Sequence, residues 1–341
     1  MGQSEVNVTQ NASRFKVLIT DYVWPNTNVE REVLERIGAE AIEAVGPDEE
    51  RLAELAADCD AILTCFAKVT DKVIRSAPNL QVVARYGVGV DNISVDTATA
   101  LGIPVTYVPD YCIEEVADHS MALLLTLARS VVNLNAGVRS GGWDPSLGRP
   151  VYRFRGKVVG IVGYGRIGRA VAARARAFGF EIAVHDPYLT ADMFPAGQAP
   201  TFVSFDELLA TSDFVSVHTP LTTDTRHLIG EPELKKMKSS AFLINTCRGP
   251  VIDEYALAQA LDGGELAGAG IDVLEGEPPP SDHPIRSARN AVITPHTAFY
   301  SEESLHELQR RTAQCAADVL SGKVPENIYN ADALASAGQL G

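Results

Sequence analysis

The chain contains 341 residues, of which 46% are hydrophobic and 21% are charged. This length predicts about two domains, each with a core of its own, and the composition is typical of globular rather than disordered proteins. The formal net charge of −15 argues against a nucleic-acid partner, because such binding depends on Lys and Arg side chains that neutralise phosphates. Five scattered cysteines, none of them in CxxC spacing, favour neither a disulfide framework nor a metal site.

The apolar segments give no indication of a membrane partner. The longest apolar run in the middle of the chain, Met121–Ala128, is too short to cross a bilayer, and the polar first residues lack the pattern of a signal peptide. We therefore expect a cytoplasmic protein. Residues 1–13 and the residues after about Asn330 are expected to be poorly ordered ends.

Two series of short apolar segments alternate with helical patterns. The first series predicts strands at residues 15–20, 61–65, 80–85 and 105–108. The second series predicts strands at residues 157–163, 181–186, 214–218, 241–246, 269–274 and 291–296. A final helix is expected from about residue 301 to residue 320. Strands that alternate with helices predict an α/β protein with two domains, each a doubly wound parallel sheet.

The longest helical pattern, at about residues 113–139, lies between the two series. Leu123, Leu127 and Leu134 share one apolar stripe, whereas Met121 falls on another face, so this helix is expected to bury more than one side. It is interpreted as an interdomain spine or as a subunit interface. His119, which also lies on this helix, is interpreted as a packing residue.

A glycine-rich turn follows the first strand of the second series. Gly163, Gly165 and Gly168 form a GxGxxG pattern between a strand and a helix, and Asp186 ends the next strand. The first glycine allows a tight turn, the second lets the backbone approach a pyrophosphate, and the third lets helix and strand pack closely. A carboxylate at position 186 binds ribose hydroxyls and repels a 2′-phosphate. The pattern therefore predicts NAD as the cofactor, preferred over NADP.

Charged and titratable residues gather at the carboxyl ends of the later strands, where open α/β sheets bind their ligands. His218, Arg248 and His296 follow strands, and Asp272 lies within one. His296 is the best acid/base candidate, since Glu277 lies in a loop from which a carboxylate reaches it and favours the imidazolium form. Arg248 is suited to bind a carboxylate and polarise a carbonyl. From these residues alone, Arg248 as a plain surface residue and His296 as a packing residue stay open.

Four segments of the chain resemble the D-isomer-specific 2-hydroxyacid dehydrogenases. These segments are residues 244–279, residues 293–304, VADHSMALLLTLAR and the GYGRIG turn. The resemblance covers nearly the whole chain and implies a Rossmann NAD-binding domain, residues 113–298, inserted into a flavodoxin-like substrate-binding domain. That second domain is split between residues 14–112 and residues 299–330. The family also implies a homodimer formed through the long helix near residues 113–139.

The resemblance also assigns roles to individual residues. His296 is implied to be the proton donor and acceptor, Glu277 its partner, and Arg248 the arginine that binds the substrate carboxylate and carbonyl. The residues implied at the NAD site are Gly163, Gly165, Arg166, Ile167, Gly168, Asp186, His218, Thr219, Pro220, Thr225, Thr246, Cys247 and Asp272. The residues implied at the substrate are Arg85, Tyr86, Val88, Gly89 and Phe299. His218 is interpreted as part of the cofactor wall rather than as a second base.

Within the family, the chain most resembles the C-terminal binding protein-like group, which combines the dehydrogenase fold with transcriptional corepression. RAFGFEIAVHDPYL, TPHTAFYSEES and GKVPENIYN carry this resemblance, although Phe299 stands where those proteins often have tryptophan. Two functions follow. The first is an NAD-dependent oxidoreductase that transfers hydride between nicotinamide C4 and C2 of a small 2-oxo or D-2-hydroxy acid. The second is an NAD(H)-sensing dimeric interaction protein with little turnover.

The substrate stays open at this stage. Glyoxylate, hydroxypyruvate and longer 2-oxo acids all suit the implied chemistry. Formate is disfavoured, because formate dehydrogenases of this fold typically carry Gln where this chain has Glu277.

Overall fold

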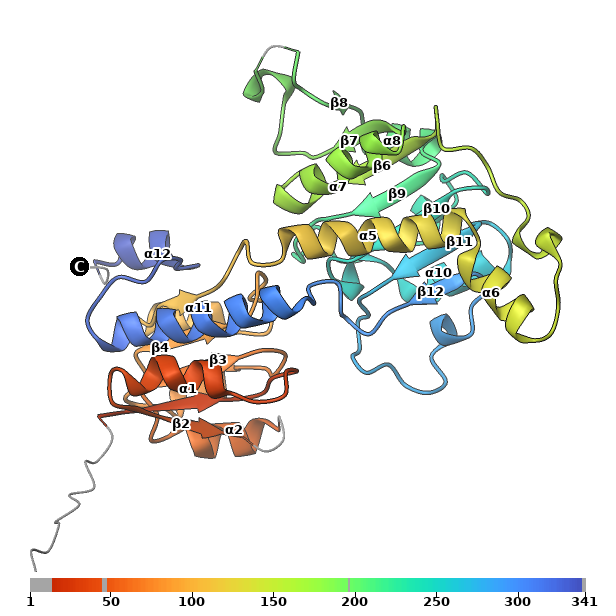
Figure 1. Cartoon of the computed structure of the whole chain (residues 1–341). Coiled ribbons are helices and arrows are strands. Elements are labelled where there is room, and N and C mark those ends of the chain that lie inside the picture. Colours follow the sequence, from red (N-terminus) through yellow and green to blue (C-terminus); the bar gives the residue numbers. More distant parts are fainter. Residues whose placement is uncertain (1–13, 45–47, 196, 339–341) are drawn as a thin grey trace, which may run out of the picture. The chain divides into compact units, whose positions relative to one another are not determined.

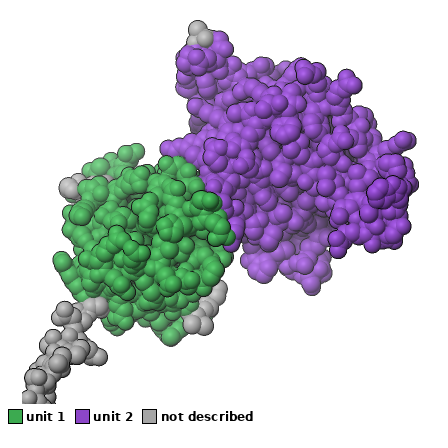
Figure 2. Space-filling view, in the orientation of Figure 1, with its two compact units in different colours: residues 1–111, 302–341 green, residues 112–301 purple. Residues whose placement is uncertain are grey.

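The computed structural model describes residues 14–44, 48–195 and 197–338. The chain forms two compact units, which Figure 2 shows in different colours. The first unit contains residues 1–111 and 302–341, and the second contains residues 112–301. The two ends of the chain therefore contribute to one unit, and the middle forms the other. Residues 1–13, expected to be poorly ordered, lie outside the described ranges.

The first unit is built on a parallel sheet of five strands in the order β2-β1-β3-β4-β5. The strands are β1 (Phe15–Ile19), β2 (Ala39–Glu43), β3 (Ala61–Thr64), β4 (Val82–Arg85) and β5 (Val105–Thr106). This strand order is flavodoxin-like, as expected. The sequence pattern does not predict β2, because two of its five residues are glutamate and it lies at the sheet edge, paired with β1.

Helices cover both faces of this first sheet. The helices of this unit are α1 (Asn28–Glu35), α2 (Glu49–Ala56), α3 (Asp71–Arg75), α4 (Val95–Ala100), α11 (Glu302–Leu320) and α12 (Ala331–Ser336). Helices α2, α3 and α4 pack their apolar residues against one face, whereas α1 and α11 lie side by side on the other (Figure 1). The expectation of a poorly ordered end directly after Asn330 is wrong, because α12 forms there and buries Leu334.

The second unit is built on a parallel sheet of seven strands in the order β12-β11-β10-β9-β6-β7-β8. The strands are β6 (Val158–Val162), β7 (Glu181–His185), β8 (Thr201–Phe202), β9 (Phe214–Val217), β10 (Phe242–Asn245), β11 (Gly268–Ile271) and β12 (Ala291–Ile293). The order reverses between β6 and β9, which is the Rossmann topology and places a ligand crevice at that reversal. The two-residue edge strand β8 is too short to give a sequence signal.

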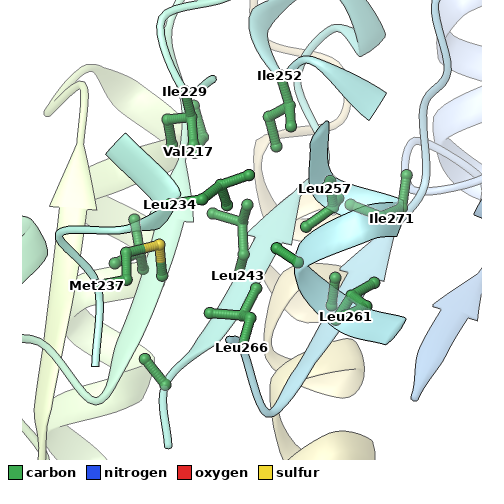
Figure 3. Packing of buried hydrophobic residues seen from close by; sticks show 14 of the residues in the cluster. Val217, Ile229, Leu234, Met237, Leu243, Ile252, Leu257, Leu261, Leu266 and Ile271 are labelled. Carbon is green, nitrogen blue, oxygen red and sulfur yellow. The ribbon is translucent and has the colours of Figure 1, made fainter. Parts of the chain in front are cut away.

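The helices of this unit also lie on both faces of its sheet. The helices of the unit are α5 (Ile113–Ala128), α6 (Val131–Arg139), α7 (Arg166–Ala177), α8 (Phe205–Thr211), α9 (Glu231–Leu234) and α10 (Glu254–Asp262), with short 3-10 turns η1 (Pro145–Gly148), η2 (Ala191–Met193), η3 (Gly249–Val251) and η4 (Pro284–Arg286). Of these, α6 does not pack on the sheet and has no buried residue. Figure 3 shows the core beneath α9 and α10, where Leu243 of β10 contributes. The next residue, Ile244, points to the opposite core beneath α5 and α7, as strand geometry requires.

The segment predicted as one long helix is two helices. Helices α5 and α6 meet at an angle of 61°. The break falls at Ser130, whose φ of 52° lies in the left-handed region and ends the regular helical hydrogen bonding. Helix α5 is largely buried on its sheet, whereas no residue of α6 is buried. In the described part of the chain, no single helix has both the length and the hydropathy of a membrane span. The bent pair of α5 and α6 reaches that length and hydropathy only when the two helices are taken together.

Candidate active site in the second unit

The turn between β6 and α7 has the geometry that a dinucleotide requires. Gly163 has φ +89°, and a Cβ there would lie 2.6 Å from the carbonyl oxygen of His218, so glycine is needed. A Cβ on Gly168 would lie 2.2 Å from the Gly163 carbonyl oxygen, which explains the close packing of helix and strand. A Cβ on Gly165 would face open space, and no side chain caps the start of α7 at Arg166. The open turn and the helix N-terminus therefore fit a pyrophosphate.

Asp186 follows β7 and lies beside this turn. Its Oδ2 accepts the N–H of Tyr164 at 2.8 Å, and its Oδ1 accepts the N–H of Tyr188 at 3.0 Å. These bonds hold the carboxylate against the glycine turn, where a ribose of a dinucleotide is expected. Of the other predicted turn residues, Arg166 is exposed and Ile167 packs against the core beneath α5 and α7.

The loop after β9 lies against the same turn. His218 Nε2 lies 2.8 Å from Ser216 Oγ, and burial lowers the pKa of His218 to about 4. The ring is therefore neutral at neutral pH, which suits a wall of the cofactor site better than a second acid/base group. Thr219 is the next residue, and its methyl group lies near the position of a Cβ on the first glycine of the turn. The Thr225 hydroxyl donates to the Pro220 carbonyl at 2.6 Å and closes the loop.

His296 and Glu277 form a hydrogen-bonded pair, as the sequence predicts. His296 Nδ1 lies 2.7 Å from Glu277 Oε2, and the two side chains are 23% and 31% exposed. Glu277 Oε1 accepts the N–H of Leu274 at 2.8 Å, so this carboxylate is itself oriented. Because a carboxylate accepts, His296 Nδ1 carries the proton of this bond and Nε2 is the ring atom left for chemistry. The Phe299 ring stands edge-on to His296 with centroids 6.0 Å apart, and it is buried.

Arg248 follows β10 in a turn held by a buried residue. Asn245 Nδ2 donates to the Arg248 carbonyl at 2.9 Å, while its Oδ1 accepts the N–H of Cys247 at 3.0 Å. Arg248 Nη1 donates to the Cys247 carbonyl at 2.7 Å. Burial raises the pKa of the Cys247 thiol, so the reactive thiolate is disfavoured. Asn245 was not among the predicted residues, although its position at a strand end beside Arg248 is the kind of signal that identified the others.

Asp272 makes hydrogen bonds to the backbone around His296. Its Oδ1 accepts the N–H of Thr297 and its Oδ2 accepts the N–H of Ala298, each at 2.9 Å. Its carbonyl oxygen accepts the N–H of His296 at 2.7 Å. The Thr294 hydroxyl also donates to Oδ1 at 2.5 Å. This carboxylate, predicted at the nicotinamide, is thus tied to the turn at residues 294–298.

Helix α5 supplies two polar side chains to these strand ends. His119 Nε2 lies 2.9 Å from Thr294 Oγ1, and Ser120 Oγ lies 2.7 Å from Thr246 Oγ1. Thr246 was predicted at the cofactor, and in this structure its hydroxyl faces α5. The sequence interpretation of His119 as a packing residue missed this contact, since the two residues it joins are 175 positions apart.

Four of the predicted substrate residues belong to the first unit. Arg85 ends β4 and is 8% exposed, and its guanidinium donates to the Tyr86 carbonyl. The Tyr86 hydroxyl donates to the buried Glu30 carboxylate at 3.1 Å. Val88 is exposed and Gly89 is partly exposed in the loop that follows. Val88 is therefore the member of this group that presents its side chain to solvent within its own unit.

The sequence from residue 121 to residue 298 matches the family model described as the NAD binding domain of D-isomer specific 2-hydroxyacid dehydrogenases. The match spans more than half of the chain. The chain belongs to the D-isomer specific 2-hydroxyacid dehydrogenase family. It is accordingly an NAD-dependent oxidoreductase.

Relatives and solved structures agree with this family. A glyoxylate reductase of Korarchaeum cryptofilum is 42% identical over 291 residues, which cover 83% of this chain and 86% of the relative. A D-3-phosphoglycerate dehydrogenase of Methanocaldococcus jannaschii is 37% identical over 92% of this chain, which spans 59% of that longer relative. The structure of D-lactate dehydrogenase from Aquifex aeolicus, complexed with NAD and lactic acid, matches with a TM-score of 0.82 and 28% identity, over 92% of this chain and 98% of that one. The dehydrogenase therefore shares both sequence and fold with 2-hydroxyacid enzymes.

The described part of this dehydrogenase contains no group of three His, Cys, Asp or Glu side chains arranged to hold a metal ion. The polar groups at the strand ends are instead tied to one another and to the backbone by hydrogen bonds, among them the bond between His296 and Glu277.

Proposed function

We propose that this dehydrogenase reduces a small 2-oxo acid to the D-2-hydroxy acid with NADH, using His296 as acid/base. The observation that carries the proposal is the 2.7 Å bond between His296 Nδ1 and Glu277 Oε2. This bond places a ring proton on Nδ1, which faces the carboxylate. Nε2 is therefore the nitrogen left to exchange a proton with the substrate. A packing histidine at a strand end needs no such oriented carboxylate.

We assign the proton transfer and the binding of the substrate to separate residues of the chain. When bound, the nicotinamide exchanges hydride between its C4 and C2 of the acid. His296 Nε2 donates the proton that the substrate oxygen takes up in reduction and accepts it in oxidation. Glu277 orients the ring through its hydrogen bond to Nδ1. The Arg248 guanidinium binds the substrate carboxylate and stabilises the negative charge that develops on the oxygen.

The proposed cofactor is NAD(H) in preference to NADP(H). The supporting feature is the Asp186 carboxylate, which two backbone N–H groups hold beside the glycine turn. A carboxylate at that place accepts ribose hydroxyls and repels the 2′-phosphate of NADP. The cofactor roles of Thr219, Pro220, Thr225, Thr246, Cys247 and Asp272 are part of the same proposal.

Glyoxylate is the first substrate to test, because a relative with 42% identity carries the name glyoxylate reductase. Phe299 is proposed as a wall of the substrate pocket, since its ring stands against His296. In the first unit, we propose that Arg85, Tyr86, Val88 and Gly89 take part in substrate binding. Exposed Val88 belongs to a loop that resembles the carboxylate-binding loop of the family.

We further propose that the enzyme is a homodimer whose interface includes α6. This helix has no buried residue, and Val131, Val132 and Val138 on it are each about half exposed. Trp143, which follows the helix, is 88% exposed. An apolar surface of this kind is rare on a monomer and is typical of an interface.

The test is NADH oxidation with glyoxylate, hydroxypyruvate, pyruvate, phenylpyruvate and 4-methylthio-2-oxobutanoate. We expect rapid turnover of at least one acid by the wild type and a loss of at least a thousandfold in kcat for His296→Ala, with NADH affinity unchanged. Tight NADH binding with feeble turnover of every acid would replace the proposal by the alternative, an NAD(H)-sensing interaction protein of the C-terminal binding protein type.

A further inference from the structure

Helix α5 touches the candidate acid/base site through His119. This residue lies outside the sets predicted from sequence, and its side chain is 24% exposed. Its Nε2 lies 2.9 Å from Thr294 Oγ1 and 3.5 Å from Asp272 Oδ1. The ring therefore contacts the two residues that hold the turn on which His296 stands.

The direction of these hydrogen bonds follows from the donors and acceptors present. The Asp272 carboxylate accepts backbone N–H groups at both of its oxygens, so it is an acceptor in this site. The Thr294 hydroxyl has one proton, which goes to Asp272 Oδ1 at 2.5 Å. The remaining bond to that hydroxyl must then come from His119. This assigns the proton of the His119 ring to Nε2.

The same chain of bonds determines the backbone of His296. The His296 N–H donates to the carbonyls of Asp272 at 2.7 Å and Thr294 at 3.0 Å. Its φ of 53° lies in the left-handed region, which a residue with a side chain adopts only when its surroundings hold it there. The residues that supply this restraint, Thr294 and Asp272, are the ones that His119 contacts.

We propose that His119 is a positioning residue, which holds the acid/base His296 in its working orientation through Thr294 and Asp272. The inference rests on the proposed function of His296. Loss of the His119 donor leaves the Thr294 hydroxyl with one restraint fewer, and the turn at residues 294–298 gains freedom. A displacement of the His296 ring by about 1 Å is enough to slow proton and hydride transfer by about a hundredfold.

The experiment compares three substitutions with wild type on the best 2-oxo acid. His119→Leu removes the donor, His119→Gln restores an N–H near the position of Nε2, and Thr294→Val removes the hydroxyl while keeping the shape of the side chain. We expect kcat to fall ten- to a hundredfold in His119→Leu and Thr294→Val, with less than threefold change in the NADH dissociation constant. His119→Gln should recover kcat to within about threefold of wild type. Exposed His306→Leu, on α11, is the matched control and should leave kcat unchanged.

The outcomes separate this inference from the function on which it rests. His296→Ala is measured in parallel, and its retention of turnover would refute the proposed function itself. If His296→Ala is inactive while folded His119→Leu keeps the wild-type kcat, only the role of His119 is overturned. If His119→Gln is as slow as His119→Leu, the ring acts by packing and the positioning role is also rejected. Circular dichroism and thermal unfolding identify any variant that fails to fold, and in that event Thr294→Val decides between the outcomes.

Discussion

His296 has both a left-handed backbone conformation and a side chain held in one orientation. Its φ of 53° is uncommon for a residue other than glycine, and its Nδ1 is bonded to Glu277 at 2.7 Å. Local propensity does not produce this conformation. It is imposed by the hydrogen bonds that the His296 N–H donates to the carbonyls of Asp272 and Thr294. The position of the ring therefore depends in part on Asp272 and Glu277, which are distant from it along the chain.

Arg248 offers the first prediction at this scale. Arg248→Lys keeps the charge but loses the planar fork that matches a carboxylate. We expect kcat/KM for the 2-oxo acid to fall about a hundredfold, mostly through KM, while the NADH dissociation constant stays within twofold. Steady-state kinetics and NADH fluorescence titration measure the two quantities. Exposed Arg289→Lys is the control, and a kcat/KM of Arg248→Lys within threefold of wild type would contradict the assignment.

At the scale of elements, the cofactor proposal rests on the strand–helix–strand unit from β6 to β7, which carries the glycine turn and is followed by Asp186. Asp186→Ala removes the carboxylate that follows β7 while the glycine turn stays intact. We expect the ratio of kcat/KM with NADPH to kcat/KM with NADH to rise at least tenfold, because the repulsion of a 2′-phosphate disappears. Kinetics with both cofactors provide the measurement. An unchanged ratio would mean that the carboxylate does not contact the adenosine ribose.

Helix α10 begins with a buried acid. Glu254 accepts the N–H of Glu275, lies 3.3 Å from His283 Nε2 and is 6% exposed at its side chain. Burial, with the charges of Glu275 and Glu277 nearby, raises the pKa of Glu254 to about 7, against the opposing effects of the hydrogen bond from the Glu275 N–H and of His227. A raised pKa means that the folded state binds this proton more tightly than the unfolded state does. Its contribution to stability is full below about pH 4.5 and is lost as the pH rises to about 7.

Glu254→Gln should therefore be more stable relative to wild type as the pH increases. The unfolding free energy of the variant minus that of the wild type should rise by on the order of 3 kcal/mol between pH 4.5 and pH 8, so that the variant is favoured at high pH. Urea unfolding at several pH values measures it. Glu231→Gln, at the exposed first position of α9, is the control. A difference that does not vary with pH would show that Glu254 titrates normally.

At the scale of the whole molecule, Trp143, just after α6, is the most exposed large apolar side chain among the described residues. If that surface is the subunit interface, a charge there separates the protomers, because an unpaired charge in a buried interface is costly. We expect Val132→Glu combined with Trp143→Glu to convert a dimer into a monomer in sedimentation velocity. Val324→Glu, at another exposed apolar position, should leave the dimer intact. A wild type that is monomeric at micromolar concentration would exclude the dimer.

The sequence determined the features that depend on local pattern. Alternating apolar strands and amphipathic helices are enough to indicate two parallel sheets, and the glycine turn with Asp186 indicates the dinucleotide site, because each is encoded within about 30 residues. His296 and Glu277 were identifiable because strand ends of parallel sheets meet at one edge. The resemblance to a family then supplied the roles.

Only the tertiary structure decided the features that depend on distant contacts. The edge strands β2 and β8 exist because a neighbour supplies their hydrogen bonds, and the division of residues 113–139 into α5 and α6 comes from a left-handed residue that the apolar pattern does not reveal. The contact of His119 with Thr294 joins residues 175 positions apart. Periodicity reports which face of an element is buried, but it does not report which polar atom of another element that face will meet.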